Sequence, residues 1–261
     1  MNFASDIKTM LVPKGTVAVF WAGQAGFIIK TSENQLIGID LYLSDCCERY
    51  FGFKRITPYI LEPHELEFDY LVSTHAHFDH FDVDAVPMMM TEKTKLVAAY
   101  DVKAECERLG INKNVTYIKT NDEVKLGNVL VKAMPCDHGE DTPDAIGLLI
   151  KIDDFRIYIA GDTSYRNDYF QNSELKNVDL FIPPINGAFG NLNAEEAAKA
   201  AGDINAKLTI PSHFWTFCQH YGNPGKFIEE MKIQKQPFYI MRHGEGVILN
   251  IVNKLGEKRG N

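Results

Sequence analysis

The chain has 261 residues, 45% of them hydrophobic, and a formal net charge of -8. This length is enough to enclose one hydrophobic core, so we expect a single domain over residues 1–261. The acidic balance comes without the clustered Lys and Arg that displace counterions from a phosphate backbone, which argues against a nucleic-acid-binding protein.

The sequence also lacks the patterns of a membrane-bound or exported protein. No apolar run approaches the roughly 20 residues of a membrane-spanning helix, and the start lacks the basic-then-apolar order of a signal peptide. We therefore expect a cytoplasmic protein that does not bind a membrane. Its five cysteines form no CxxC pair, and we expect them to be reduced and structural, including Cys136 and Cys218.

The first half of the chain predicts short strands separated by turns and two helices. The strands are expected over residues 16–21, 26–31, 36–40, 70–73, 96–99 and 116–118. The helices are expected over residues 83–90 and 102–109, and Gly110 is a typical C-terminal stop for the second of them.

The second half repeats this plan of short strands alternating with helices. Strands are expected over residues 129–134, 145–152, 156–160, 180–182 and 208–211. A helix over residues 194–201 has Asn193 as N-cap, Glu196 three positions on as its capping-box partner, and Gly202 at its end. Periodicity alone does not say how these strands pair.

One short segment concentrates metal-ligand side chains. His75, His77, Asp79 and His80 follow the apolar run at residues 70–72. In an extended segment side chains alternate, so His75 and His77 project to the same side and can hold one ion. Asp79 and His80 lie where the chain turns toward a helix, so they can reach a second ion. Neutral imidazole and carboxylate groups are common ligands of catalytic divalent metals.

Further candidate ligands come directly after other predicted strands. Asp40 follows residues 36–39, His138 follows 129–134, Asp162 follows 156–161, and His213 follows 208–212. A single Asp or His after a strand is commonly a turn former or helix cap. Their recurrence at carboxyl ends of strands, where sites gather in helix-covered sheets, favours one shared metal site.

This set resembles the metallo-β-lactamase superfamily, whose HxHxDH motif is matched by residues 75–80. His138, Asp162 within Gly161-Asp162-Thr163, and His213 follow in the same order. Residues 20–27, 55–63, 68–75 and 161–165 are similar to the L-ascorbate-6-phosphate lactonase-like branch. The likeness covers roughly residues 15 to 250. It implies an α/β (α+β) fold, a four-layer αββα sandwich with a cleft between two β-rich halves.

The resemblance also implies a role for each candidate ligand. Carried over by position, His75, His77 and His138 bind a first divalent ion, Asp79, His80 and His213 bind a second, and Asp162 bridges both. Asp40 supports the ligands from behind, as outer carboxylates do. Asp82 has two readings, another supporting carboxylate or a helix N-cap.

The implied chemistry is metal-dependent hydrolysis. Two cations lower the pKa of a water from 15.7 toward ~7 and hold the hydroxide as a bridging nucleophile, which Asp79 orients as the catalytic residue. The donors suit Zn, Mn or Fe, and the lactonase resemblance points to Mn. The expected reaction opens a lactone or related ester in a small, sugar-like substrate. One alternative for this substrate is a phosphorylated sugar.

Several side chains are candidates for contact with the substrate. Arg166, His220 and Asn186 are candidates for substrate binding, since they lie on expected cleft loops. The side chains available for a phosphate are Arg166, Lys54, Arg55, Arg242, His243 and His220. Two alternatives stay open: a phosphodiesterase for small molecules or lipids on the same dinuclear site, and a non-catalytic metal-binding protein. The apolar run Met88-Met89-Met90 belongs either to the core or to a homo-oligomer interface.

Overall fold

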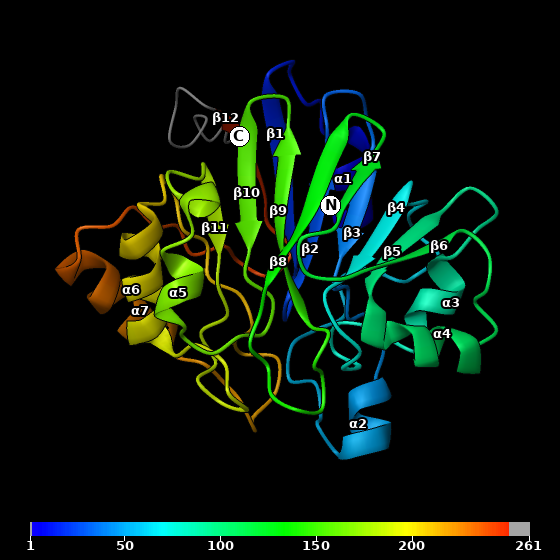
Figure 1. Cartoon of the computed structure of the whole chain (residues 1–261). Helices are drawn as coiled ribbons and strands as arrows, with labels where there is room; N and C mark the ends of the chain where they lie inside the picture. Colours follow the sequence, from blue (N-terminus) through cyan, green and yellow to red (C-terminus); the bar gives the residue numbers. More distant parts are fainter. Residues whose placement is uncertain (1, 251–261) are drawn as a thin grey trace.

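Two β-sheets form the centre of the molecule (Figure 1). The computed structural model describes residues 2–250. Within that range one sheet has seven strands and the other five, and a continuous hydrophobic core contains residues of both. The mixed α/β fold with two sheets expected from the sequence is confirmed.

The larger sheet has the strand order β12-β1-β2-β3-β4-β5-β6. Its first part is antiparallel, from β12 to β3, and its second part, from β3 to β6, is parallel. The strands are β1 (Thr16–Gly23), β2 (Gly26–Lys30), β3 (Leu36–Ile39), β4 (Tyr70–Ser73), β5 (Lys95–Ala99), β6 (Val115–Ile118) and β12 (Gly246–Asn250). The central strands are buried on both faces, which explains why they read as unbroken apolar runs.

The smaller sheet has the order β11-β10-β9-β8-β7. Strands β7 to β10 are antiparallel neighbours, and β11 runs parallel to β10. The strands are β7 (Glu123–Leu126), β8 (Val129–Pro135), β9 (Ile146–Ile152), β10 (Phe155–Ile159) and β11 (Leu180–Ile182). Since β8 and β10 both run antiparallel to β9, they leave the sheet at the same end.

Helices flank the sheets on both sides. The helices are α1 (Phe3–Thr9), α2 (Cys46–Phe51), α3 (Ala85–Met89), α4 (Lys103–Arg108), α5 (Asn167–Phe170), α6 (Ala194–Ile204) and α7 (Pro224–Ile233). Helices α5, α6 and α7 lie together beside β11, whereas α3 and α4 lie on the side of β5 and β6 (Figure 1). Across residues 2–250, no helix combines the length and apolar character needed to cross a membrane.

The helix predicted over residues 194–201 is confirmed at its start but ends later than predicted. The capping box is confirmed: Asn193 accepts hydrogen bonds from the first turn of α6, and Glu196 accepts from the Asn193 amide. The helix does not end at Gly202, however, but continues to Ile204 and closes on Asn205 in the left-handed conformation. A Cβ at Gly202 would lie 3.2 Å from the Gln234 side chain, so this glycine allows close packing instead of a stop.

The strand predicted over residues 208–211 is wrong as a full strand. Thr209 makes only isolated bridges to Phe181 and Phe238. Strands β7 and β12 and the short helices α1, α2, α5 and α7 were not predicted individually. Helix α4 and the Gly110 turn after it follow the prediction, although a 3-10 turn at Tyr100–Val102 precedes the helix.

The topology brings the candidate ligands to one edge of the two sheets. Asp40 and His75 follow the parallel neighbours β3 and β4, and His138 and Asp162 follow β8 and β10. A backbone hydrogen bond from Ile146 to Thr74 (3.0 Å) ties the sheets together there. Gly161, with φ +66, is required at this point because a Cβ would lie 2.8 Å from the Ile146 carbonyl.

Candidate metal centre

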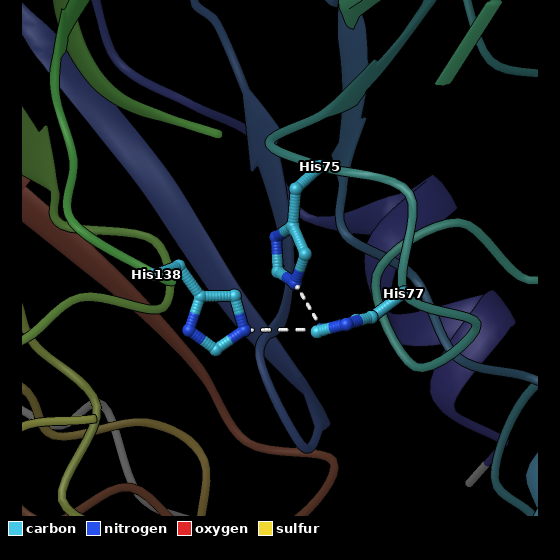
Figure 2. A group of neighbouring side chains, drawn as sticks. All are labelled: His75, His77 and His138. Atoms are coloured by element: carbon cyan, nitrogen blue, oxygen red, sulfur yellow. Dashed lines mark hydrogen bonds between the residues drawn. The ribbon is translucent and has the colours of Figure 1, made fainter. Parts of the chain in front are cut away.

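Three histidines from both halves of the chain converge on one point. His75 Nε2 lies 3.1 Å from His77 Nδ1, which lies 3.0 Å from His138 Nε2 (Figure 2). Ligand nitrogens held 2.0–2.1 Å from one tetrahedral zinc are about 3.3 Å apart, so this spacing is that of a metal-binding triad. The structure therefore brings together the three histidines that the sequence assigned to a first ion.

A second group lies directly beside the first. His213 Nε2 is 3.2 Å from Asp79 Oδ2 and 3.1 Å from Asp162 Oδ2. His80 Nε2 is 3.2 Å from the other oxygen of Asp162 and 3.9 Å from Asp79 Oδ2. Asp162 thus contacts both histidines of this group and also lies 3.7 Å from His138 Nε2. It is placed between the two groups, where a bridging carboxylate would be.

These positions fit divalent metal ions. Three sets of side chains bring one ligand atom each to within 4.8 Å of one another: His75, His77 and His138; His75, His80 and Asp162; and Asp79, His80 and His213. His80 Nε2 and Asp162 Oδ1 are buried and face each other 3.2 Å apart as an ion pair, but neither atom makes a hydrogen bond of good geometry. Buried polar atoms are rarely left unpaired, and a cation between these two would satisfy both.

Asp40 fixes the ligand segment from behind. Its carboxylate contacts His80 Nδ1 at 2.9 Å and accepts hydrogen bonds from the backbone amide and hydroxyl of Thr74. The residue is 1% exposed and has φ +48. Because Asp40 contacts Nδ1, Nε2 of His80 is directed at the metal position. Carboxylates behind a metal ligand commonly orient its imidazole in this way.

Two amide side chains at the site had no role in the sequence prediction. Gln24 Nε2 donates to Asp79 Oδ2 (2.9 Å) and lies 3.1 Å from His213 Nε2. Asn191 Nδ2 donates to Asp162 Oδ2 (2.6 Å). Gln24 belongs to the Gly23-Gln24-Ala25-Gly26 turn between β1 and β2 and is 1% exposed, and its burial and contacts appear only in the folded chain.

The two groups differ in their electrostatics. Burial lowers the pKa of His77 and His138, and lowers the pKa of His75 well below its ordinary value. Burial also lowers the pKa of His213, but the carboxylates of Asp162 and Asp79 outweigh it and raise that pKa to about 9. The imidazoles of His75, His77 and His138 are therefore neutral at pH 7. Each has a free lone pair, which metal binding requires.

The carboxylates of the second group are ionised. Burial alone would raise the pKa values of Asp79 and Asp162, but the histidines around them lower both well below the ordinary value. The pKa of His80 is raised well above its ordinary value because Asp162, Asp40 and Asp79 outweigh the effect of burial. Without metal, this group is an ion-paired network whose histidines hold protons that a cation would displace.

Several other predicted residues lie away from the ligands. The Asp82 carboxylate accepts hydrogen bonds from Leu43 and Ser44 and from the amide of Ala85 in the first turn of α3. The N-cap of this helix is Asp84, so the prediction of Asp82 as the N-cap is wrong by two positions. Arg166 pairs with Asp137 at 3.2 Å and is half exposed outside the pocket lining. The structure therefore does not bring Arg166 to the site.

The remaining phosphate candidates are also placed elsewhere. Arg55 donates to the carbonyls of Tyr42 and Ser44, and His243 Nε2 lies 3.1 Å from the Ala22 carbonyl. Lys54 and Arg242 are absent from the described residues that line the pocket. Of that list only His220 lies in the pocket, and it is 5% exposed.

The two cysteines near the ligands differ in their surroundings. Cys136 donates from Sγ to the Asp162 carbonyl, as a structural cysteine would, whereas Cys218 is exposed, so the expected structural position is wrong for Cys218. Neither belongs to the groups of described residues that could hold a metal. Met89 is buried in the core and Met88 is 57% exposed.

The candidate ligands open into a pocket of about 450 Å³. His77, Asp79, His138, Asp162 and His213 line it. Asn186 and His220, both predicted for substrate binding, lie in its wall. The site thus combines a ligand cluster with a cavity large enough for a small molecule.

Known proteins are similar to this chain in sequence. Residues 41–214 match the model of the beta-lactamase superfamily domain. The chain is 30% identical over 237 residues to the UPF0173 metal-dependent hydrolase TK0141 of Thermococcus kodakarensis. This alignment covers 88% of this chain and 98% of the relative. It is 28% identical over 200 residues to a UPF0173 metal-dependent hydrolase of Bacillus cereus, over 72% of this chain and 86% of the relative.

A solved structure shows the same fold. Igni18, a metallo hydrolase of Ignicoccus hospitalis, aligns with a TM-score of 0.72 at 22% identity, over 90% of this chain and 99% of that one. The two sheets and the His/Asp centre define a protein of the metallo-β-lactamase superfamily. Within it, the chain belongs to the UPF0173 metal-dependent hydrolase family.

Proposed function

We propose that this hydrolase opens a lactone or a related carbonyl ester at a centre of two divalent ions. The observation that supports this most is the convergence of all seven predicted ligands in two adjacent groups, with Asp162 between the groups and five of the seven lining one pocket. A complete ligand set argues against a non-catalytic metal-binding protein, where a missing ligand would be expected.

The proposed ions are Zn or Mn, with Fe also suited to these donors. Bound there, they would lower the pKa of a water toward ~7 and polarise the carbonyl of the substrate. His75, His77 and His138 would hold one ion and Asp79, His80 and His213 the other, with Asp162 between them.

In this proposal Asp79 orients the attacking water. Its contacts with Gln24 and His213 both use Oδ2, so Oδ1 can accept a hydrogen bond from a water in the pocket. Because the pKa of Asp79 is well below its ordinary value, the carboxylate is ionised at neutral pH and can take this role. Gln24 keeps the carboxylate in place by donating to it.

His220 and Asn186 are placed to contact the substrate from the pocket wall. Burial and the neighbouring His213 lower the pKa of His220 to about 4, so its imidazole is neutral at pH 7. A neutral imidazole can donate one hydrogen bond to a carbonyl or leaving oxygen without adding charge. Asn186 offers an amide for the same purpose.

The test is hydrolysis by protein that has been stripped of metal and reloaded separately with Mn and Zn. The substrates are δ-valerolactone, L-ascorbate 6-phosphate and bis(4-nitrophenyl) phosphate. We expect metal-dependent lactone opening that is lost in a His75→Ala, His77→Ala double variant. Hydrolysis of the phosphodiester alone would replace this proposal with the phosphodiesterase alternative.

A further inference from the structure

Five aromatic side chains, in two contacting groups, line the pocket. Phe53 lies 5.5 Å from His220 and 6.0 Å from Phe189, ring centre to ring centre, and Phe51 lies 5.3 Å from Phe78. All five side chains line the same cavity as the metal ligands. We call these five residues the aromatic subsite.

The subsite is attached directly to the ligand-bearing segments. Phe78 lies between the ligands His77 and Asp79 in the sequence. Phe189 belongs to the loop whose Asn191 donates to Asp162. A flat group held against these rings would therefore lie next to the reacting atoms.

The outer members of the subsite are open to the cavity. Phe51 and Phe189 are 58% and 62% exposed and both line the pocket, so their ring surfaces are available to a ligand. Phe189 also has φ +54, an unfavourable backbone conformation for a residue with a Cβ. Strain of this kind concentrates at ligand-binding positions, where function maintains it.

His220 supplies one polar atom inside the apolar wall. It is 5% exposed, lies 5.0 Å from both Phe217 and His213 by ring centres, and its Nδ1 has no hydrogen-bond partner. A buried polar atom without a partner in a pocket is explained by a ligand that completes it.

Away from the proposed metal ions, the pocket offers no cationic side chain to a phosphorylated substrate. Among the described residues that line it there is no lysine or arginine, and the exposed acids Glu140 and Asp141 belong to the lining. Phosphate recognition by side chains normally uses Arg or Lys. A phosphate that lies beyond the reach of the metal ions would instead meet these two carboxylates.

We infer that the substrate is an uncharged ester or lactone with an aromatic ring beside the reacting carbonyl, and that the aromatic subsite binds this ring. This inference rests on the proposed hydrolase function. In the reaction the oxygen of water bonds to the carbonyl carbon, the bond from that carbon to the ester oxygen breaks, and the leaving alkoxide takes up a proton. A lactone gives one hydroxy acid that carries the ring, whereas an open ester gives a separate acid and alcohol.

Binding tests the subsite without catalysis. Calorimetry on the metal-loaded protein compares 1,4-dihydroisoquinolin-3-one, a benzo-fused lactam, with 2-piperidinone, the same lactam ring without the benzene. Both lactams resist hydrolysis. We expect the benzo-fused lactam to bind about tenfold more tightly or better, because desolvated aromatic contacts carry much of the affinity of such sites. Equal affinities would overturn the inference.

Hydrolysis of the matching lactones tests selectivity. We expect kcat/KM for 3-isochromanone to exceed that for δ-valerolactone by about tenfold, after each is divided by its rate with hydroxide alone. L-ascorbate 6-phosphate is expected to be the poorest of the three. If neither lactone is opened but the benzo-fused lactam still binds selectively, the proposed hydrolysis fails and the subsite stands.

Variants locate the effect. Phe189→Ala truncates an exposed ring and should reduce the preference for the benzo-fused ligand about threefold to tenfold, whereas Phe189→Tyr should keep it. Tyr100→Ala, which removes another exposed ring (41% exposed) outside the pocket lining, should leave it unchanged. Glu140→Lys should raise the relative kcat/KM for the phosphorylated lactone. Loss of the preference in Tyr100→Ala but not in Phe189→Ala would overturn the inference.

Discussion

His80 is held by carboxylates on both ring nitrogens. Asp40 contacts Nδ1 at 2.9 Å, and Asp162 lies 3.2 Å from Nε2. The first contact sets the tautomer, and the second marks where a cation would be shared. His80 is thus fixed in a metal-binding orientation before any ion arrives.

Replacing the supporting carboxylate should weaken metal binding without removing a ligand. We expect Asp40→Asn to lower the affinity for the second ion about 10–100-fold, because the amide holds the His80 imidazole less firmly and makes it less basic. Competition with a fluorescent chelator measures this affinity. Asp154→Asn, at an exposed turn, is the control, and equal affinities in both variants would contradict the role of Asp40.

The metal-free protein should show a stability maximum near pH 6.5. Below this pH, His75, His77 and His138 oppose folding, because their lowered pKa values make the unfolded chain bind more protons. Above it, the stabilisation from protonated His213 is lost as pH rises from 6.5 through about 9, by at most about 3 kcal/mol.

Thermal unfolding between pH 5 and 10, with and without chelator, measures this effect. Metal-loaded protein is the control, since ligands that bind an ion do not take up protons in this range. A metal-free protein whose stability rises steadily from pH 6.5 to 9 would show that His213 is not held in the charged form.

The residues that could be predicted at this scale are those with a local signal. The HxHxDH segment identifies itself because four ligand side chains, three His and one Asp, lie within six positions, and the resemblance supplies His138, Asp162 and His213. Gln24 and Phe189 carry no such signal. Gln24 meets His213 across 189 positions, so only the folded chain shows their contact.

At the scale of elements, β2 anchors the N-terminal helix through one buried lysine. Lys30 Nζ donates to the carbonyls of Ile7 (2.8 Å), Lys8 (3.0 Å) and Met10 (2.9 Å), and Lys30 is 4% exposed. These carbonyls lie at or just after the C-terminal end of α1, where helix carbonyls lack intrahelical partners. The ammonium group therefore completes the helix and places it against the sheet.

Lys30→Met should destabilise the protein by about 2–4 kcal/mol. The substitution keeps the length of the side chain but leaves buried carbonyls without their donor. Urea unfolding measures the change, and Lys125→Met, at an exposed position of β7, is the control. A loss below about 0.5 kcal/mol would mean that water replaces the ammonium group.

The elements themselves were predictable where an apolar run or a cap marks them. Asn193 and Glu196 predicted the start of α6 because a capping box is local, whereas its end depends on packing of Gly202 against Gln234. Helix α2 escaped prediction because its six residues include cysteine, tyrosine and phenylalanine, which favour helix weakly. Gly52, in the left-handed conformation after it, was the available signal.

For the whole molecule, the metal centre joins the two halves of the chain. His75, His77, Asp79 and His80 follow the larger sheet, whereas His138 and Asp162 follow the smaller one. Bound ions would therefore link the sheets at one edge and favour the folded state. The sequence alone could not place the sheets against each other, because strand pairing is set by long-range contacts.

Metal removal should lower the melting temperature. At a free metal concentration of 100 times Kd, one site adds about 2.7 kcal/mol, which corresponds to roughly 5–10 °C for a chain of this size. Scanning calorimetry on loaded and chelated protein measures the shift. The His75→Ala, His77→Ala double variant should respond less, and an equal response would place the metal elsewhere.

Catalysis is expected to depend on both adjacent ligand groups. The most direct measurement titrates stripped protein with Mn or Zn and follows δ-lactone opening at each ratio of metal to protein. We predict a rate that rises to a plateau at two equivalents and stays near the uncatalysed level in the His75→Ala, His77→Ala double variant. Turnover that does not depend on added metal would show that the ligand groups are not the catalytic centre. Two bound ions with no turnover of any lactone or ester would contradict the proposed hydrolysis.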